Sequence, residues 1–274
     1  MGSAPDRSGA GPPANLAGLL SAAAARDPEG LALVAGGHGL SWSELDATVT
    51  AVAAGLRARD LRFGDRVAMS LPNSVGFVQL YLGALRAGLV VAPLDPSTPT
   101  ADTDAALADT GARLHVTHEA AVADLIGAGT GTGTAPEPGP VPGGESLAAL
   151  LQTAGTGGRP KRAMLSHRAL LANLDQMAAL EPAPVVAADV VLLALPMFHV
   201  FGLNAVFGQA LHAGARMVLA PDGQLDAAAS LLDLVASSGV TSVAGTPELY
   251  AAWTAHPRAR EALAGVRVLV SGSA

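Results

Sequence analysis

Apolar residues in the first part of the chain recur with the spacing of strands and helices in turn. Two apolar runs at 31–34 and 40–42 flank the turn-forming residues 36–39, which predicts a β-hairpin. Ser43 is the expected N-cap of the helix that follows. One face of this helix is apolar and consists of Leu45, Val49, Val52 and Leu56.

The alternation continues to residue 117. Short apolar runs predict strands at 66–70, 89–92 and 113–117. A helix is expected between the first two, with an apolar face of Phe77, Leu80, Tyr81 and Leu85. Strands that alternate with helices through short links are typical of a parallel α/β sheet.

A second unit of the same kind is expected after residue 146. Residues 163–165 should complete a hairpin, and Ser166 is expected to cap the next helix. Further strands are expected at 190–195, 216–219, 241–244 and 266–270, with helices between them. The predicted fold class is therefore α/β, with two mainly parallel sheets flanked by helices.

The segment between the two units has the sequence GAGTGTGTAPEPGPVPGG and lacks core-forming residues. Such a segment buries too little apolar surface to offset its ordering entropy, which predicts a mobile linker. The expected division is a disordered leader at 1–14, a first subdomain at 15–126, a linker at 127–145 and a second subdomain at 146–274.

Composition excludes several classes of protein. The chain has 274 residues, a net charge of −7 and no basic stripe with interleaved aromatic residues, so nucleic acid is not an expected partner. It has no cysteine, which excludes disulfides, thiol catalysis and thiolate metal sites. The apolar run 190–211 is interrupted by polar residues and does not predict a membrane span. Without a signal peptide pattern, we expect a soluble, cytoplasmic protein whose oligomeric state the sequence does not indicate.

The most informative motif is TAGTGGRPK, which extends from Thr153 to Lys161. Glycines allow close approach of the backbone to a ligand, while hydroxyls, backbone N–H groups and cations bind phosphate. The alternative interpretation is a glycine-rich hairpin between two strands. The residues expected to bind a polyphosphate are Thr153, Gly155, Thr156, Gly157, Gly158, Arg159 and Lys161.

This motif resembles the phosphate-binding loop of the AMP-forming acyl-CoA synthetases, T-S-G-T-T-G-x-P-K-G. It departs from that pattern at Ala154, Gly157 and Arg162, so two hydroxyls are absent. Segments 64–96, 195–203, 239–253 and 266–274 also resemble the family, in the same order. The resemblance implies the N-terminal domain of the adenylate-forming fold, incomplete at the C-terminus and without the small C-terminal domain.

The resemblance also implies site residues and co-substrates. The implied acyl-substrate pocket consists of His199, Val200, Phe201, Gly202, Gly245 and Thr246. The implied adenine side consists of Gly272, Ser273 and Ala274. The implied reaction joins a small carboxylic acid to ATP with Mg²⁺ and then transfers the acyl group to coenzyme A. A medium- or long-chain fatty acid is the first expected substrate, and an aromatic, cinnamate-like acid is the second.

Single histidines have other interpretations. A lone histidine in an apolar stretch is more often a packed structural residue than a pocket residue, but the motif around His199 favours the pocket. His115 and His118 are spaced like a weak metal pair, but no carboxylate or third histidine stands at suitable spacing, so they are expected to be surface residues at a strand end and no metal site is predicted.

The family's Tyr-Gly-x-Thr-Glu segment, ribose-binding aspartate and C-terminal lysine have no counterpart in the sequence. We therefore expect these 274 residues alone to form no adenylate, a prediction that pyrophosphate release would test. The alternatives are a catalytically dead module that binds nucleotide or acyl chains and a non-functional fragment.

Overall fold

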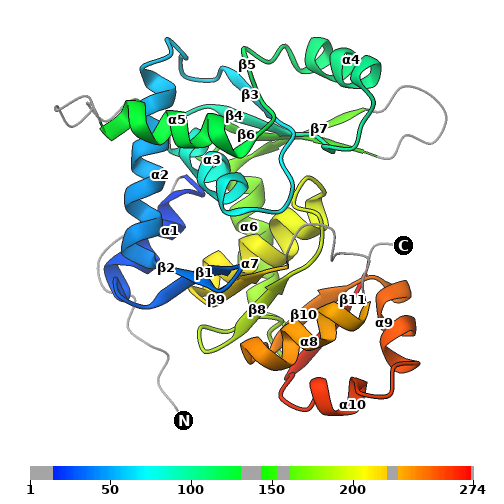
Figure 1. The fold of residues 1–274 in the computed structure, drawn as a ribbon. Coiled ribbons are helices and arrows are strands. Elements are labelled where there is room, and N and C mark those ends of the chain that lie inside the picture. The colour runs from blue at the N-terminus through cyan, green and yellow to red at the C-terminus, as the bar shows by residue number, and fades with distance from the viewer. Residues whose placement is uncertain (1–14, 131–142, 154–160, 221–227, 273–274) are drawn as a thin grey trace.

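The computed structural model describes residues 15–130, 143–153, 161–220 and 228–272, in which two β-sheets alternate with layers of helices (Figure 1). Sheet A has the strand order β11-β10-β8-β9-β1-β2, and sheet B has the order β5-β3-β4-β6-β7. The strands of sheet A are β1 (Leu31–Ala35), β2 (His38–Ser41), β8 (Val190–Leu193), β9 (Arg216–Leu219), β10 (Ser242–Gly245) and β11 (Val268–Ser271). Those of sheet B are β3 (Arg66–Met69), β4 (Val90–Pro93), β5 (Leu114–Val116), β6 (Leu147–Gln152) and β7 (Arg162–Ser166).

Most neighbouring strands in both sheets are parallel, as the sequence predicts. Antiparallel pairing occurs where a hairpin joins consecutive strands, between β1 and β2 and between β6 and β7. Since parallel strands need long connections, helices fill the space between successive strands. The described part of the chain therefore has the expected α/β architecture with two mainly parallel sheets.

Helices occupy three layers around the sheets. The central layer packs into one apolar core with both sheets and contains α1 (Gly18–Arg26), α2 (Trp42–Arg57), α3 (Val75–Arg86), α5 (Glu119–Thr130), α6 (His167–Ala178), the π-helix η1 (Phe201–Gly208) and α7 (Gln209–Ala213). The outer face of sheet A is covered by α8 (Ala228–Ser238), α9 (Pro247–Thr254) and α10 (Ala259–Ala262). The outer face of sheet B is covered by α4 (Thr100–Thr110).

Helix α2 begins two residues earlier than the sequence pattern indicated. Ser41, not Ser43, is its N-cap: the Ser41 hydroxyl accepts a hydrogen bond from the Glu44 amide at 3.2 Å. In return the Glu44 carboxylate accepts one from the Ser41 amide at 2.8 Å. This reciprocal capping box satisfies two backbone donors, which explains why Ser41 displaces Ser43 from the role.

The start of the expected linker is helical. Residues 127–130 form the last turn of α5, and residues 131–142 lie outside the described residues. A Cβ on Gly129 would lie 2.0 Å from the Ala51 carbonyl oxygen, and one on Gly55 would lie 2.1 Å from that of Leu125. These two glycines allow α2 and α5 to pack backbone against backbone, a reason for glycine that composition alone does not reveal.

The two sheets do not follow the expected boundary at residues 127–145. Strands β1 and β2 precede that segment but join sheet A, whose other strands follow it. Strands β6 and β7 follow the segment but join sheet B. Each sheet therefore needs residues from both halves of the chain.

Candidate active site

Three parallel strands of sheet A end side by side. Ser242 and Val243 of β10 pair with Val191 and Leu192 of β8, and Gly245 at the end of β10 pairs with Ser271 of β11. In open α/β sheets, ligands bind in the crevice beyond the carboxyl ends of the strands. A ligand site is therefore expected beyond the ends of β8, β10 and β11.

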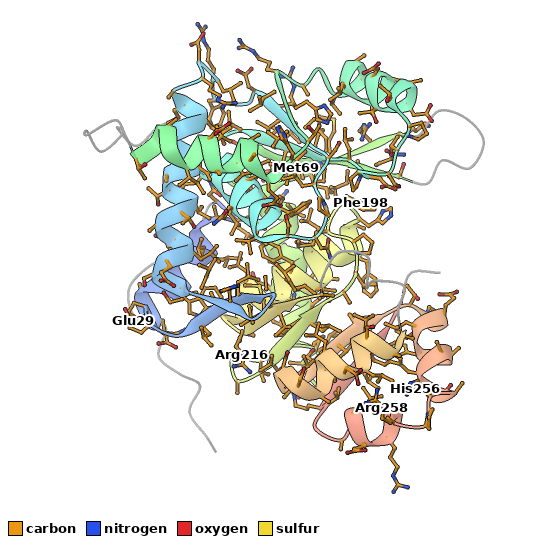
Figure 2. All side chains as sticks on the ribbon, in the orientation of Figure 1. Glu29, Met69, Phe198, Arg216, His256 and Arg258 are labelled. Atoms are coloured by element: carbon orange, nitrogen blue, oxygen red, sulfur yellow. The ribbon has the colours of Figure 1, made fainter. Side chains whose placement is uncertain are left out.

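The chain leaves β8 through a tight turn that carries the predicted residue His199. Asn73, which is buried, holds this turn: its amide nitrogen donates to the Leu195 carbonyl at 2.8 Å, and its oxygen accepts from the Met197 amide at 2.8 Å. Asn73 lies in the connection after β3, so sheet B fixes the path of the chain beyond sheet A. Phe198 lies on this turn, between the two sheets (Figure 2).

His199 and Val200 are both exposed on the turn, and the His199 ring lies 4.5 Å from that of Phe198, centre to centre. His199 is therefore not a packed core residue. Gly202, near the start of the helix that follows, packs closely against the backbone of the turn after β8. A Cβ on Gly202 would lie 2.3 Å from the Pro196 carbonyl oxygen. Only glycine fits this approach.

Three residues predicted from separate motifs meet at the strand ends. Gly272 donates from its amide to the Gly245 carbonyl at 3.2 Å, and a Cβ on Gly272 would lie 3.2 Å from the edge of the Phe201 ring. Thr246 follows Gly245 and caps α9, since its hydroxyl accepts from the Leu249 amide at 3.3 Å. Thr246 thus has a structural role in holding the end of β10.

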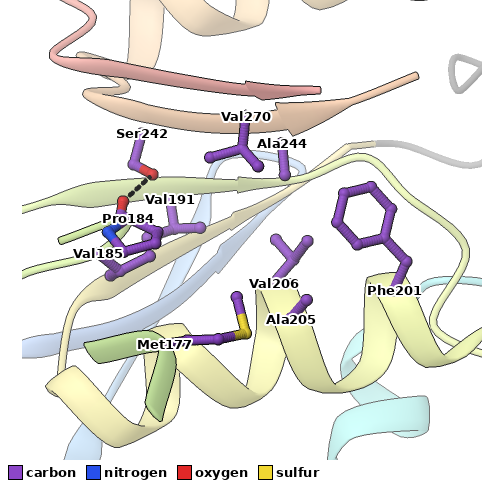
Figure 3. A pocket seen from close by; sticks show the side chains of 10 residues that line it. All are labelled: Met177, Pro184, Val185, Val191, Phe201, Ala205, Val206, Ser242, Ala244 and Val270. Carbon is purple, nitrogen blue, oxygen red and sulfur yellow. Dashed lines mark hydrogen bonds between the residues drawn. The ribbon is translucent and has the colours of Figure 1, made fainter. Parts of the chain in front are cut away.

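An apolar pocket lies between η1 and the inner face of sheet A (Figure 3). Its cavity volume is ≈ 20 Å³. No charged side chain lines it among the described residues, and its single hydroxyl, on Ser242, donates to the Pro184 carbonyl at 2.9 Å. The lining residues are Met177, Pro184, Val185, Val191, Phe201, Ala205, Val206, Ser242, Ala244 and Val270. Such a surface accommodates an apolar group and offers it no polar partner.

The phosphate motif connects the two strands of the β6–β7 hairpin: it begins directly after β6 and ends directly before β7. The amide and the hydroxyl of Thr153 both donate to the Lys161 carbonyl at 2.9 Å, which closes the base of the loop. The Lys161 side chain is exposed. The other predicted loop residues, Gly155, Thr156, Gly157, Gly158 and Arg159, lie outside the described residues, as do Ser273 and Ala274 on the adenine side.

Arg162, one of the departures from the family motif, anchors the hairpin to α4. Its side chain is 11% exposed, and its Nε lies 3.3 Å from the Asp109 carboxylate. Its Nη1 is buried without a hydrogen-bond partner among the described residues. Arg162 also lines a groove of ≈ 700 Å³ beside α4, whose wall includes the carboxylates of Asp102 and Asp109.

Within the described ranges, the predicted residues therefore form two groups that no hydrogen bond or ion pair connects. Phe201, Gly245 and Gly272 meet at sheet A, while Thr153 and Lys161 meet at the end of the hairpin in sheet B. No group of three or more potential metal ligands of the types His, Cys, Asp and Glu occurs in the parts of the chain that the structure describes.

The weak histidine pair has a structural explanation. His115 Nε2 lies 2.9 Å from the Ser70 hydroxyl on the neighbouring strand. Burial lowers the pKa of His115, and the charge of Asp104 offsets part of this effect. His118 is exposed.

Most residues of the site region were not singled out from the sequence, among them Asn73 and Met177. Asn73 stands in a Leu-Pro-Asn-Ser run between a strand and a helix, and a polar residue at such a strand exit is the signal that points to it. Met177 fits the apolar face of α6, and no local pattern distinguishes a pocket residue from a core residue there.

Comparison with known proteins identifies the family. Residues 20–274 match the model of the family described as AMP-binding enzyme. Feruloyl-CoA synthase of Amycolatopsis sp is 34% identical over 259 residues, which cover 90% of this chain and 52% of the relative. 4-coumarate–CoA ligase 3 of Arabidopsis thaliana is 30% identical over 271 residues, which cover 88% of this chain and 48% of the relative. The chain thus spans about half the length of the curated relatives that it matches.

Solved structures agree with this result. The crystal structure of ATP-bound MatB from Rhodopseudomonas palustris is 31% identical and superimposes with a TM-score of 0.82, covering 95% of this chain and 55% of that one. The N-terminal subdomain of Klebsiella oxytoca NpsA has a TM-score of 0.83 at 23% identity, which supports the fold alone. No helix in the described ranges has both the length and the apolar character needed to cross a lipid bilayer. The family match, the two relatives and the shared fold together show that the chain belongs to the AMP-binding enzyme family, whose curated relatives here are CoA ligases and synthases.

Proposed function

We propose that this chain binds ATP and a small carboxylic acid for a reaction in which the acid is activated with ATP and the acyl group is then transferred to coenzyme A. The observation that carries this proposal is that Phe201, Gly245 and Gly272 meet at the carboxyl ends of parallel strands, beside an uncharged pocket that Phe201 lines. The names of the relatives, CoA ligases and synthases, and the ATP-bound state of the MatB structure support the choice of co-substrates.

The proposed chemistry has two steps. A carboxylate oxygen attacks the α-phosphorus of ATP, and the bond to pyrophosphate breaks, giving an acyl-adenylate and pyrophosphate. The sulfur of coenzyme A then attacks the acyl carbon, AMP leaves with the bonding electron pair, and the thiol proton passes to solvent. Because negative charge accumulates on the departing pyrophosphate, catalysis depends mainly on positioning and on cationic stabilisation.

The residues of this chain would share the binding tasks. Lys161 and Thr153 would face the phosphates, and the motif implies Arg159 as a further cation. The apolar pocket would hold the acyl group, with the acid's carboxylate toward the strand ends near Gly245. Mg²⁺ remains an expectation from the family resemblance, and no described residue is assigned to hold it.

For the acid itself, we propose an aliphatic substrate. The pocket lining is aliphatic except for Phe201, and no unused polar group faces the cavity to bind the ring hydroxyl of a phenolic acid. The relatives named for feruloyl and coumarate substrates make an aromatic acid the competing choice.

The test uses the fact that Lys161 is the one lysine in the sequence. Reductive methylation with ¹³C-formaldehyde places an NMR label on this side chain and on the N-terminal amine alone. We expect ATP to shift the dimethyl-Lys161 signal, and we expect Lys161→Ala to weaken ATP binding about tenfold or more, the size of a lost charge-assisted hydrogen bond.

Arg59→Ala is a suitable control, since Arg59 is an exposed cation at the end of α2. The proposal would be contradicted if saturating ATP left the dimethyl-Lys161 signal unshifted, or if Lys161→Ala and Arg59→Ala lost equal affinity for ATP.

A further inference from the structure

The apolar pocket has a definite direction. Its wall on sheet A follows β10 from Ser242, the first residue of the strand, to Ala244, next to the last. Phe201 lies at the Ala244 end, beyond which the carboxyl ends of the strands meet (Figure 3). Met177, Pro184 and Val185 lie at the opposite end, beside the beginning of the strands. The Phe201 end therefore faces the reacting groups, and the Met177 end is the floor.

Most of the floor is fixed in place. Pro184 accepts from the Ser242 hydroxyl at 2.9 Å, and the Arg267 guanidinium donates to the carbonyls of Ala183 at 3.0 Å and Pro184 at 3.4 Å. Val185 is buried and has a branched side chain with few rotamers. Movement of these residues away from the cavity would break hydrogen bonds or disrupt core packing.

Met177 is the adjustable part of the floor. It stands in the last turn of α6, is only partly buried, and extends its thioether and methyl group under the pocket (Figure 3). An unbranched methionine side chain has three rotatable bonds and adapts its shape readily. With Met177 in this position the cavity is ≈ 20 Å³, and about 10–15 Å³ on this scale holds one water-sized group. The pocket thus admits about the last one or two carbon atoms of a short acyl chain.

We infer that Met177 is a specificity-determining residue that limits the substrate to a short aliphatic acid. The inference rests on the proposed function, since it assigns the acyl group to this pocket. A phenyl ring or a long alkyl chain requires more space than the cavity offers, and Met177 blocks the direction in which a chain would extend. Truncation of Met177 removes three heavy atoms from the floor and opens that direction.

The test compares non-hydrolysable N-acylsulfamoyl adenosines that carry butyryl, octanoyl and cinnamoyl groups. For the wild-type chain we expect the butyryl compound to bind about tenfold or more tightly than the other two, a discrimination typical of steric exclusion from an apolar pocket. In Met177→Ala the difference should shrink to about twofold or less, through gains by the octanoyl and cinnamoyl compounds. Met164→Ala is the matched control, since Met164 lies on β7 and is 67% exposed.

A second measurement guards against a variant that merely folds poorly. In protein labelled with [methyl-¹³C]methionine, the Met177 signal is identified by its loss in Met177→Leu. Free butyrate should shift this signal, and the exposed Met164 signal should remain unchanged. Met177→Leu conserves volume and should keep the preference for the butyryl compound.

The outcomes separate this inference from the proposed function. Equal affinity of the wild-type chain for all three compounds, or a preference that survives Met177→Ala, would overturn the role of Met177 while leaving the nucleotide site intact. If neither ATP nor any acylsulfamoyl adenosine binds, the proposed function fails. The inference then stands only if free butyrate still shifts the Met177 methyl, and it falls if butyrate does not.

Discussion

Among single residues, Asp189 does most to align the strands that form the site. Its buried carboxylate accepts hydrogen bonds from the Arg267 guanidinium, from the Thr241 hydroxyl at 2.7 Å and from the Val186 amide at 2.8 Å. Burial alone raises the pKa of Asp189, but the bonds from Arg267, Val186 and Thr241 hold it below its usual value. The charged group therefore joins the beginnings of β8, β10 and β11, which sets where their carboxyl ends lie.

His167 is a second buried polar residue, and it links the chain's N-terminal region to α6. Its Nδ1 accepts from the Leu16 amide at 3.2 Å, so the neutral ring carries its proton on Nε2. Nε2 is buried without a partner among the described residues. Burial lowers the pKa of His167 from 6.5 to about 4, because no acceptor there stabilises the charged ring.

This environment predicts a loss of stability in mild acid. Between pH 6.5 and about 4 the unfolded chain binds a proton at His167 that the folded chain does not, so the free energy of unfolding should fall as pH decreases through this window. Across this whole window, the proton binding of His167 lowers the free energy of unfolding by about 3 kcal/mol. Urea unfolding at several pH values measures it. His167→Gln should flatten the slope in this window, and a slope equal to that of the wild-type protein would refute the assignment.

At the scale of elements, the connection between β3 and α3 supports the candidate site from outside its own sheet. Asn73 in this connection bonds both sides of the turn after β8, and Ser74 caps α3 by accepting from the Phe77 amide at 3.0 Å. The turn in question leads directly into η1, whose first residue is Phe201. Sheet B thereby positions the residue that forms one end of the pocket.

We predict that Asn73→Ala destabilises the fold by about 2–4 kcal/mol, because it leaves a buried carbonyl at Leu195 and a buried amide at Met197 without partners. Amide hydrogen exchange should accelerate at Met197 well before global unfolding. Asn73→Asp keeps the acceptor for Met197 and should retain part of that protection. A Met197 amide that exchanges at the wild-type rate in Asn73→Ala would contradict this role.

The elements themselves were largely predictable, because their signals are local. The apolar face of α2, the cap at Ser166 and the Gly36-Gly37 hairpin all depend on residues within one or two turns of chain. The π-helical form of η1 was not predicted, because the apolar pattern indicates a helix between two strands and does not distinguish a π-helix from an α-helix. The capping role of Ser41 depends on the side chain of Glu44, which made Ser43 the wrong choice.

At the scale of the whole molecule, the two sheets share one central core, and each takes strands from both sides of residues 127–145 (Figure 1). This exchange was not predictable from local patterns, because the pairing of β1 with β9 joins residues separated by most of the chain. The pocket was only partly predictable for the same reason. Phe201 followed from the family resemblance, whereas Met177 and Asn73 are brought to the site by tertiary packing alone.

In the proposed function, one site at the carboxyl ends of β8, β10 and β11 binds both the nucleotide and the acid. The most direct measurement is a crystal structure of this chain with N-butyrylsulfamoyl adenosine. We expect the butyryl group between Phe201 and Met177, the adenosine beside Gly272, and the sulfamoyl group at the ends of these strands. An adenosine bound elsewhere, for example in the groove beside α4, or a butyryl group outside the apolar pocket would contradict the account.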